Sequence, residues 1–434
     1  MTQISSRASG NLDTSVPVVV LKTHHGSLGI ARSLGRLGVD VYGITASPNE
    51  PSTLSRYWRA CYHWNLDSAT AERSVEYFLE LGRQLGRRAI LIPVSDTTAM
   101  FVAEHAEALR QAYLFRALSP ELIRTLTSKK GMYALVKKLG IPTAETLFPS
   151  SRTDVVRFLD SAVFPVMLKA NDGVLLFART GRKMAIVRNA AELLDYYDRW
   201  EDPDNPNLML QEYIPGADDT VWMFNGYFNT ASDCLVGFTG KKIRQNPVSM
   251  GSTSLGICLP NEEVYKTTLK FMKAVGYQGI LDIGYRYDAR DGKYKVLDVN
   301  CRIGSTFRLF VDSNGLDVVR ALYRDITGQP VPAAASTAGR KWVAEDLDVE
   351  SFYQSWRAGR IGILQWIWSF RGVREGAWFA LDDLRPFAAV CRIYFASFAR
   401  LVRRSLQPAL LRVLQRAGWA KPRSCAPLRP PGDA

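Results

Sequence analysis

The sequence predicts an α/β domain, then an α+β domain, then a helical C-terminal region. The first domain is predicted because short apolar runs alternate with helical segments as far as about residue 118, the pattern of parallel βαβ units. The second is predicted because the chain then becomes rich in strands, with a few separate helices, as far as about residue 330. A Pro, Ala, Ser and Gly linker at 330–339 precedes a Trp-rich, mainly helical region.

The first predicted domain opens with a buried strand. Residues 16–21 read Val-Pro-Val-Val-Val-Leu, a continuous apolar run of the kind found in strands that are buried on both faces. The turn that follows lacks the G-x-G-x-x-G pattern, which disfavours a dinucleotide site there. The segment before this first strand is polar and lacks the apolar core of a signal peptide. The expected strands are 16–21, 39–45, 59–66 and 89–94, and the expected helices are 30–37 and 69–85.

The second predicted domain begins with a helix at about 128–139, which should stop at Gly140 because Pro142 lies just beyond. The strands expected after it are 164–170, 183–188, 208–214, 220–228, 234–243, 279–287 and 294–300, with helices at 190–200 and 261–275. The predicted boundaries are a disordered leader at 1–15, the α/β domain at 16–118, the second domain at 119–330 with lobes 119–214 and 215–330, the helical region at 331–420 and a disordered tail at 421–434.

Composition is that of an ordinary globular protein, with 47% hydrophobic and 22% charged residues among 434. The net charge is +13, but ten Arg or Lys and only one acid lie from Arg385 onward, so the body is close to neutral and a nucleic-acid-coating protein is disfavoured. The six cysteines are widely spaced, which favours reduced thiols and a cytoplasmic location. All four histidines lie in the first quarter, so a metal site further along should use oxygen ligands.

The most informative segment is a predicted β-hairpin at 279–302. Asp298 and Asn300 are two residues apart on its second strand and therefore point to the same face. Register decides where Asp282 lies: a two-residue Asp-Gly turn sends it to the opposite face, whereas a three- or five-residue loop places it directly across from Asp298. In the second register two carboxylates and a carboxamide share one face, an arrangement that suits Mg²⁺. The alternative is a hairpin with a solvated polar face.

Positive side chains stand at the ends of two other predicted strands. Lys169 ends the strand at 164–170 and enters a loop bounded by Gly173 and Gly181, where a lysine can meet phosphate oxygens. Taken alone, such a residue is more often an ordinary strand-end lysine. The run Lys241-Lys-Ile-Arg244 places a positive cluster at the end of another strand.

The stretch from about 120 to 328 resembles an ATP-grasp ligase, and the α/β unit before it resembles the pre-ATP-grasp domain of that superfamily. The matching segments, in chain order, are Lys129-Lys through Gly140-Ile-Pro-Thr, Pro165-Val-Met-Leu-Lys169, Gln211-Glu-Tyr-Ile-Pro-Gly216, and Asp282 with Asp298-Val-Asn300-Cys-Arg302. Within the superfamily the chain is most similar to the predicted carboxylate–amine ligases, which include D-aspartate ligases. That narrower resemblance rests on Lys-Ile-Arg-Gln-Asn-Pro, on Leu-Asp-Ile-Gly-Tyr-Arg-Tyr-Asp and on the Trp-rich tail.

The resemblance implies a role for each matching residue. The implied contacts to ATP, on its phosphates, adenine edge or ribose, are Lys129, Lys169, Lys183, Gln211, Glu212, Tyr213, Ile214 and Asp219. The implied ligands of two Mg²⁺ ions, or of Mn²⁺, are Asp282, Asp298 and Asn300. The implied catalytic side chains near the transferred phosphate are Lys241, Arg244 and Arg302, and Ser305 would hold a substrate carboxylate. An ordinary structural role remains open for Asp219, Ser305 and one of Lys129 and Lys130.

The resemblance also implies the reaction. A carboxylate would attack the γ-phosphate of ATP to give an acyl phosphate, and an amine would then displace phosphate, leaving ADP and phosphate as products. The expected substrates are small carboxylates and amines, such as amino acids or a cell-envelope precursor, and no oligomeric state is indicated. The alternative function is an ATP-binding module without turnover.

Three features depart from the family pattern. Asp298 stands where a longer Glu is common, and Cys301 stands where proline is frequent. The loop at 173–181 is more apolar than a typical glycine-rich lid. Because Asp298 still provides carboxylate oxygen, we expect catalysis to survive the first change.

Residues 387–416 are predicted to form apolar, basic helices. Such helices can lie on an anionic leaflet at the inner face of the membrane, or their apolar side can pack on the body of the protein while the arginines are solvated. We expect no stretch of the chain to span a bilayer, since none reaches 18 uninterrupted apolar residues.

Overall fold

The computed structural model of the chain describes residues 12–182, 184–249, 251–335 and 338–396. The chain divides into two units, residues 1–386 and residues 387–434, and all three sheets belong to the first. Several predictions concern residues outside these ranges. They are the tail helices from residue 397 onward, the role of Lys183 and the disordered ends at 1–11 and 421–434. No helix within the described ranges is both long enough and apolar enough to cross a bilayer.

The N-terminal part is a parallel five-stranded sheet in the order β3-β2-β1-β4-β5. Its central strand, β1, is fully buried, as its β-branched sequence predicts. The apolar face of α2 packs Phe78 and Leu81 against Val19 and Leu21 of this strand. The strands are β1 (Val18–Leu21), β2 (Val41–Thr45), β3 (Ala60–His63), β4 (Ala89–Pro93) and β5 (Tyr113–Leu114), and the helices are α1 (His25–Gly35), α2 (Ala71–Leu85), α3 (Asp96–Glu104) and α4 (Ala106–Leu109).

A smaller, antiparallel sheet of four strands follows, in the order β6-β9-β7-β8. Helices α7 and α9 pack against it through a separate apolar core that includes Val155, Leu168, Leu193 and Leu210. The predicted lid loop is partly helical: the apolar sequence Gly-Val-Leu-Leu-Phe-Ala-Arg-Thr forms α8. The elements are β6 (Thr146–Leu147), α7 (Arg152–Leu159), β7 (Val166–Ala170), α8 (Gly173–Thr180), β8 (Met184–Val187), α9 (Ala190–Trp200) and β9 (Leu208–Glu212).

The largest sheet has seven strands in the order β14-β13-β10-β11-β12-β15-β16. Its strands pair antiparallel except β15 and β16, which are parallel. The sequence analysis did not predict β12, β15 or β16, and β15 and β16 extend the sheet from the region predicted to be mainly helical. The strands are β10 (Val221–Phe228), β11 (Cys234–Asn246), β12 (Ser252–Cys258), β13 (Gly279–Asp288), β14 (Lys293–Asn300), β15 (Lys341–Val343) and β16 (Val373–Gly376).

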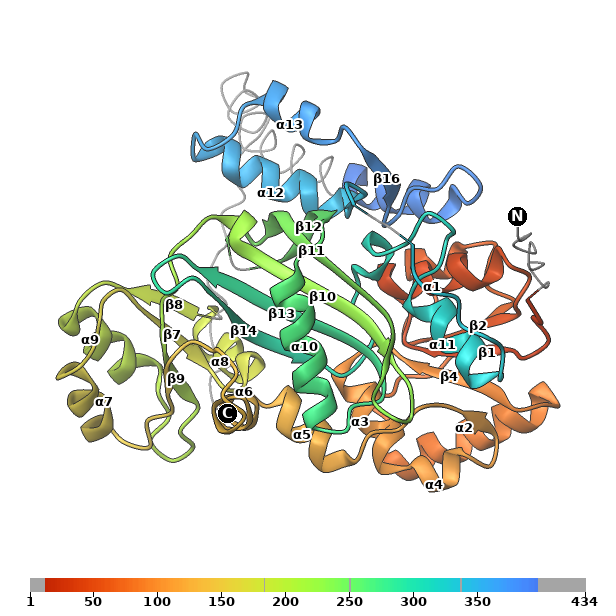
Figure 1. Ribbon diagram of the computed structural model, residues 1–434, viewed down its shortest axis with the longest axis horizontal. Helices are drawn as coiled ribbons and strands as arrows, with labels where there is room; N and C mark the ends of the chain where they lie inside the picture. The colour runs from red at the N-terminus through yellow and green to blue at the C-terminus, as the bar shows by residue number, and fades with distance from the viewer. Residues whose placement is uncertain (1–11, 183, 250, 336–337, 397–434) are drawn as a thin grey trace, which may run out of the picture. The chain divides into compact units, whose positions relative to one another are not determined.

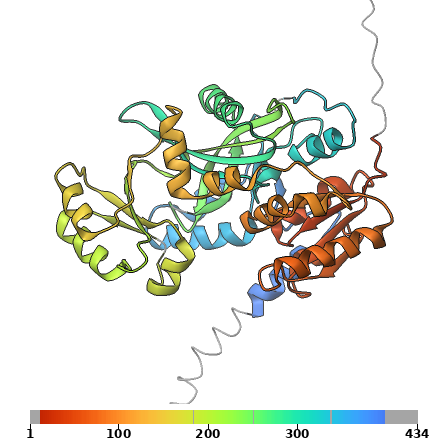
Figure 2. The same ribbon diagram turned by 90° about the horizontal axis from the view of Figure 1, so that it is seen from below.

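Helix α10 lies across one face of this sheet in both ribbon views (Figures 1 and 2). Its Phe271 and Met272 join Phe224, Leu281 and Ile283 of the strands in the main core. On the opposite face, Tyr227 contacts Asp325 of α11, and Met223 lines a cleft. The helices around the sheet are α5 (Pro120–Thr127), α6 (Lys129–Lys138), α10 (Glu262–Ala274), α11 (Val318–Ile326), α12 (Glu345–Arg357) and α13 (Ile363–Ser369), with short 3-10 turns at Pro51–Leu54, Asp218–Thr220 and Phe307–Leu309.

Candidate active site

Three oxygen-bearing side chains converge on one face of the β13–β14 hairpin. Asp282 lies opposite Asn300, and Gly284 lies opposite Asp298. The Nδ2 atom of Asn300 donates to Oδ2 of Asp298 at 3.2 Å and to Oδ2 of Asp282 at 3.4 Å. The predicted gathering of two carboxylates and a carboxamide on one face therefore occurs.

The register that produces it is neither of the two predicted ones. The loop has four residues, 289–292, and β14 contains a bulge at Leu297. Val296 faces the main core, so simple alternation along the strand would turn Asp298 toward the core as well. The extra residue shifts the alternation by one, which returns Val299 to the core and leaves Asp298 facing the cleft.

Two glycines make room for the carboxylates. A Cβ atom at Gly284 would lie 2.4 Å from Oδ1 of Asp298, and one at Gly304 would lie 2.4 Å from Oδ2 of Asp282. Any larger residue at either position would therefore have to displace a carboxylate. A glycine inside a strand is a signal of such a close approach, and Gly284 could have been recognised from the sequence in this way.

The hairpin face forms one wall of a cleft with a volume of about 830 Å³. The four-stranded sheet and α8 provide the facing wall through Lys169, Met184, Gln211 and Phe177. The predicted site residues that line the cleft are Lys129, Lys169, Gln211, Glu212, Ile214, Asp282, Asp298, Asn300, Arg302 and Ser305.

Two lysines reach the cleft from the side of the small sheet. The Nζ atom of Lys169 donates to Oε1 of Gln211 at 2.8 Å. Burial and, to a smaller extent, the nearby charge of Lys129 together lower the pKa of Lys169 to about 8. Of the Lys129–Lys130 pair, Lys129 lines the cleft, whereas the backbone N–H of Lys130 faces Oδ1 of Asn171 at 3.4 Å.

The cation that β11 contributes to the cleft is Lys242, which the sequence analysis did not select. Its Nζ donates to the carbonyl of Gly251 at 2.9 Å and to Oε1 of Gln245 at 3.2 Å. Burial lowers the pKa of Lys242, while Asp298 and Asp282 act in the opposite direction. The two carboxylates are therefore its electrostatic partners across the cleft.

The two β11 residues that were predicted to be catalytic lie elsewhere. Lys241 forms an ion pair with Asp219, Nζ to Oδ2 at 3.5 Å, and neither residue lines the cleft. Arg244 is buried and binds both carboxylate oxygens of Asp348 in α12 at 2.8–2.9 Å. The pairing of β11 with β12 is irregular between Lys242 and Gln245, and Lys242 and Arg244, two residues apart, do not share a face.

The segment that carries Gln211 and Glu212 is held by the hairpin that carries the acids. Arg290 donates to Oε1 of Glu212 at 2.6 Å, and Lys295 lies 3.3 Å from Oε2 of the same carboxylate. Gln211 donates from Nε2 to Oγ1 of Thr146 at 3.0 Å. Tyr213 does not line the cleft, whereas Ile214 does.

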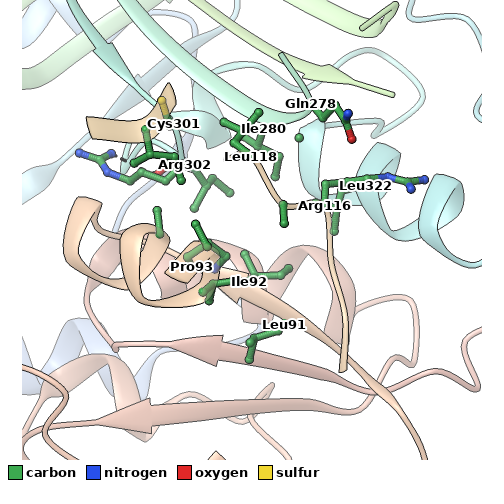
Figure 3. A pocket seen from close by; sticks show the side chains of 17 residues that line it. Leu91, Ile92, Pro93, Arg116, Leu118, Gln278, Ile280, Cys301, Arg302 and Leu322 are labelled. Atoms are coloured by element: carbon green, nitrogen blue, oxygen red, sulfur yellow. Dashed lines mark hydrogen bonds between the residues drawn. The ribbon is translucent and has the colours of Figure 1, made fainter. Parts of the chain in front are cut away.

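Arg302 connects the hairpin to the N-terminal sheet. Its Nη2 donates to Oδ1 of Asn300 at 3.1 Å, and its Nε donates to Oδ1 of Asp96 at 3.2 Å. Asp96 begins α3 directly after β4, and ligands of open α/β sheets bind at such carboxyl ends of strands. Figure 3 shows Arg302 and Cys301 beside Ile92 and Pro93 of β4, around a mostly apolar cavity of about 50 Å³ that is too small for a nucleotide.

Helix α1 approaches the same place from the end of β1. A Cβ atom at Gly26 would lie 2.9 Å from the Cα of Ser305, so the start of α1 adjoins this cleft residue. His24 caps the helix by accepting the N–H of Gly26 at Nδ1. Burial and, to a smaller extent, the neighbouring His25 together lower the pKa of His24 to about 3, so the ring is neutral at physiological pH.

The charge state of Asp282 reflects its burial. Burial raises the pKa of Asp282, Arg302 opposes the rise and Asp298 supports it, and the resulting pKa is about 6. Two carboxylates this close need a cation between them or a proton on one of them. The donor set, two carboxylates and one carboxamide, fits Mg²⁺, which takes one or two carboxylates and completes its shell with phosphates and water. Among the described residues, no group of three or more His, Cys, Asp or Glu side chains could hold a metal ion by itself.

Three residues that line the cleft each carry a buried polar atom without a hydrogen-bond partner among the described residues. These atoms are Nε2 of Gln245, Oδ1 of Asn246 and Nε of Arg286.

Comparisons with known proteins agree with this geometry. The chain is 25% identical to a D-aspartate ligase of Enterococcus faecium over 318 residues, which cover 66% of this chain and 74% of that protein. It superposes on an L-amino acid ligase from Bacillus licheniformis with a TM-score of 0.54 and 16% identity, covering 73% and 75% of the two chains. No family model matches the chain.

A third similar structure was solved with a bound nucleotide. The biotin carboxylase domain of Hydrogenobacter thermophilus 2-oxoglutarate carboxylase, solved with MgADP, ADP and bicarbonate, superposes with a TM-score of 0.56 and 21% identity over 74% of this chain and 72% of that one. These structures share the ATP-grasp fold, and the biotin carboxylase domain was solved with MgADP. The chain thus has the ATP-grasp fold and is similar in sequence to a D-aspartate ligase.

Proposed function

We propose that the cleft activates the carboxylate of one amino acid and transfers it to the amine of a second small molecule. The observation that carries the proposal is the convergence of Asp282, Asp298 and Asn300 on one face, with Lys242 and Lys169 in the same cleft. This is an oxygen-donor face beside cations, which is what a metal-bound triphosphate requires.

In this assignment Asp282, Asp298 and Asn300 hold two Mg²⁺ ions, and Mn²⁺ suits the same oxygen donors. The bound metal would neutralise the charge of the phosphate oxygens. Lys169, Lys129 and Lys242 would contact the phosphates, with Lys242 taking the place first given to Lys241 and Arg244. Gln211 and Ile214 would contact the adenine, while Glu212 acts through its ion pairs with the hairpin.

The proposed substrate end of the cleft lies where Arg302, Ser305 and Asp96 meet. Ser305 and the start of α1 would bind a carboxylate, because a helix N-terminus favours anions. Asp96 fixes the direction of the Arg302 guanidinium, which remains beside Asn300. Amino acids are the proposed substrate class because the printed names of two similar proteins, a D-aspartate ligase and an L-amino acid ligase, specify them.

The proposed reaction has two steps. A carboxylate oxygen attacks the γ-phosphorus of ATP, the bond from that phosphorus to the bridging oxygen breaks, and ADP leaves with the electron pair. The amine then attacks the acyl carbon, the C–N bond forms, and phosphate leaves as the amine loses a proton. Arg302 and Lys242 would stabilise the charge that develops on the transferred phosphoryl group and on the carbonyl oxygen.

The test is a screen for ADP and phosphate release over pairs of amino acids, with D-isomers included. We expect one family of pairs to give ATP-dependent release, and hydroxylamine to replace the amine and trap the activated acid as a hydroxamate. Asp298→Ala serves as the control and should abolish release while the protein remains folded. If the folded wild-type chain binds ATP but releases no more ADP with any pair than Asp298→Ala, the ligase assignment fails and an ATP-binding module remains.

A further inference from the structure

Polar contacts join helices α12 and α13 to each other and to the large sheet. The indole Nε1 of Trp366 donates to Oδ2 of Asp348 at 2.8 Å, and Arg244 of β11 donates to Oγ of Ser369 at 2.8 Å. The ring of Trp366 also stacks on Phe352, with centroids 4.3 Å apart. The two helices therefore form one packed layer, which lies beside β11 and β12 in Figure 1.

The apolar side of this layer faces outward. In α12 the buried residues are Asp348, Ser351 and Ser355, whereas Val349 is exposed on the other side of the helix. In α13 no residue is buried, although the helix reads Ile-Leu-Gln-Trp-Ile-Trp-Ser. The exposed side chains that define the α12–α13 surface are Tyr353, Trp356, Ile363, Leu364, Ile367 and Trp368.

The degree of exposure is large. Leu364 is 73% exposed and Trp368 is 67% exposed. A helix of a water-soluble protein normally buries its apolar stripe and exposes its polar one, and here the order is reversed. Exposed apolar side chains of this kind mark a surface that binds a membrane or another protein.

Charge identifies the kind of partner. Between Glu350 and Glu375 the sequence has four arginines, Arg357, Arg360, Arg371 and Arg374, and no Asp or Glu. All four are exposed, and within the described residues none has an acidic side chain within 4.0 Å. The partner should therefore be apolar in the middle and negatively charged around it.

We propose that the α12–α13 surface docks the enzyme on an anionic lipid bilayer. Trp, Tyr, Ile and Leu side chains would enter the interface between headgroups and acyl chains, while the arginines would meet the lipid phosphates. A second copy of the chain fits less well, because in a two-fold contact the partner surface would carry the same four arginines and no Asp or Glu between residues 350 and 375 to pair with them. The cleft residues Asp282, Asp298 and Lys169 lie outside this surface, so docking leaves the chemistry in place.

The test measures co-sedimentation of the full-length protein with vesicles of phosphatidylcholine, with and without phosphatidylglycerol. We expect binding only to the anionic vesicles, and at least about tenfold weaker binding for Leu364→Gln/Trp368→Gln, because two interfacial side chains are lost. Val163→Gln is the matched control: Val163 is equally exposed but lies before β7. ADP release should be unchanged in both variants, which shows that they are folded.

Several results would overturn the proposal. One is equal binding of wild-type protein and the double variant to anionic vesicles. Another is loss of binding only in Arg403→Gln/Arg404→Gln, which would assign the contact to the C-terminal segment. A third is a wild-type dimer in light scattering that becomes monomeric in the Leu364→Gln/Trp368→Gln variant, which would make this surface a contact between copies.

Discussion

Strand β11 delivers cations to two different environments. Arg244 reaches the α12 side, where both oxygens of Asp348 bind it and the ring of Phe370 lies 5.6 Å from its guanidinium. Lys242 reaches the cleft, where it donates hydrogen bonds to neutral oxygens. Asp298 and Asp282 interact with it only electrostatically, at longer range. A cation that is fully paired inside the protein stabilises the fold, whereas a cation that is buried without a direct acid is ready to bind an anion.

The largest effect should come from breaking the ion pair between Arg244 and Asp348, and it should be an effect on stability. Arg244→Met leaves Asp348 buried without its cation, so we expect a loss of about 3–5 kcal/mol in the free energy of unfolding. Denaturant unfolding followed by circular dichroism measures it. Turnover per folded molecule should stay near the wild-type value, and a large fall in turnover at full stability would return Arg244 to the reaction. The double variant Arg244→Met/Asp348→Leu should recover part of the loss.

Removing Lys242 should have the opposite consequence, a loss of activity without a loss of stability. Lys242→Met should lower kcat by about 10²–10³-fold, because one preorganised positive group beside the phosphates is removed. Its stability should not fall, since an incompletely paired buried charge is lost. Lys241→Met is the matched control on the same strand: its exposed ion pair with Asp219 contributes little, so both kcat and stability should change only slightly. Equal kinetic effects at the two positions would contradict the comparison.

The third prediction concerns the position of Asp298 rather than its charge. In Gly284→Ala the new methyl group would occupy space now filled by Oδ1 of Asp298, so the carboxylate must move. We expect kcat to fall by about 10²-fold with little change in the melting temperature. Steady-state kinetics beside a thermal melt measures this, and Gly292→Ala, in the hairpin loop, controls for the general cost of losing a glycine. Its own effect should be confined to stability, because Gly292 has a φ of +69°.

The smallest effect is a pH dependence. Lys169 has a pKa of about 8, so it is charged below that pH and neutral above it. An anionic nucleotide favours the charged form, and its affinity should therefore fall as the pH rises through about 8, by up to about tenfold per pH unit. Calorimetric titration with MgADP between about pH 7 and about pH 9 tests this. Lys169→Arg stays charged throughout and should give a flatter profile; an identical slope would show that another group titrates.

Most of the fold could be predicted from local pattern. The strand at 16–21 and the helix at 69–85 carry clear apolar periodicity, and the structure contains β1 and α2 at those places. The edge strands β15 and β16 were missed because they are short and lie in a stretch rich in Trp and Arg. Their strand structure depends on pairing with β12, which local sequence does not encode.

The site was predictable at the level of residue type and less so at the level of side-chain direction. Asp282, Asp298 and Asn300 were predicted to share one face, and the structure places them on one face, although both predicted registers were wrong. The roles of Lys241 and Arg244 came from the family resemblance, which did not distinguish Lys241 from its neighbour Lys242 on the other face of the strand. The pair Val296-Leu297, two adjacent apolar residues in an alternating strand, was the available sign of the bulge in β14.

The extra residue in β14 also sets which mutations this strand can tolerate. Replacing Leu297 by another apolar residue keeps the count of residues, so every later side chain keeps its side of the sheet. Deleting it would place Asp298 directly after Val296, so ordinary alternation would still turn Asp298 and Asn300 toward the cleft and Val299 toward the core. Loss of residue 297 should therefore remove only the bulge, whereas deletion of Val299 would turn Asn300 from the cleft to the core.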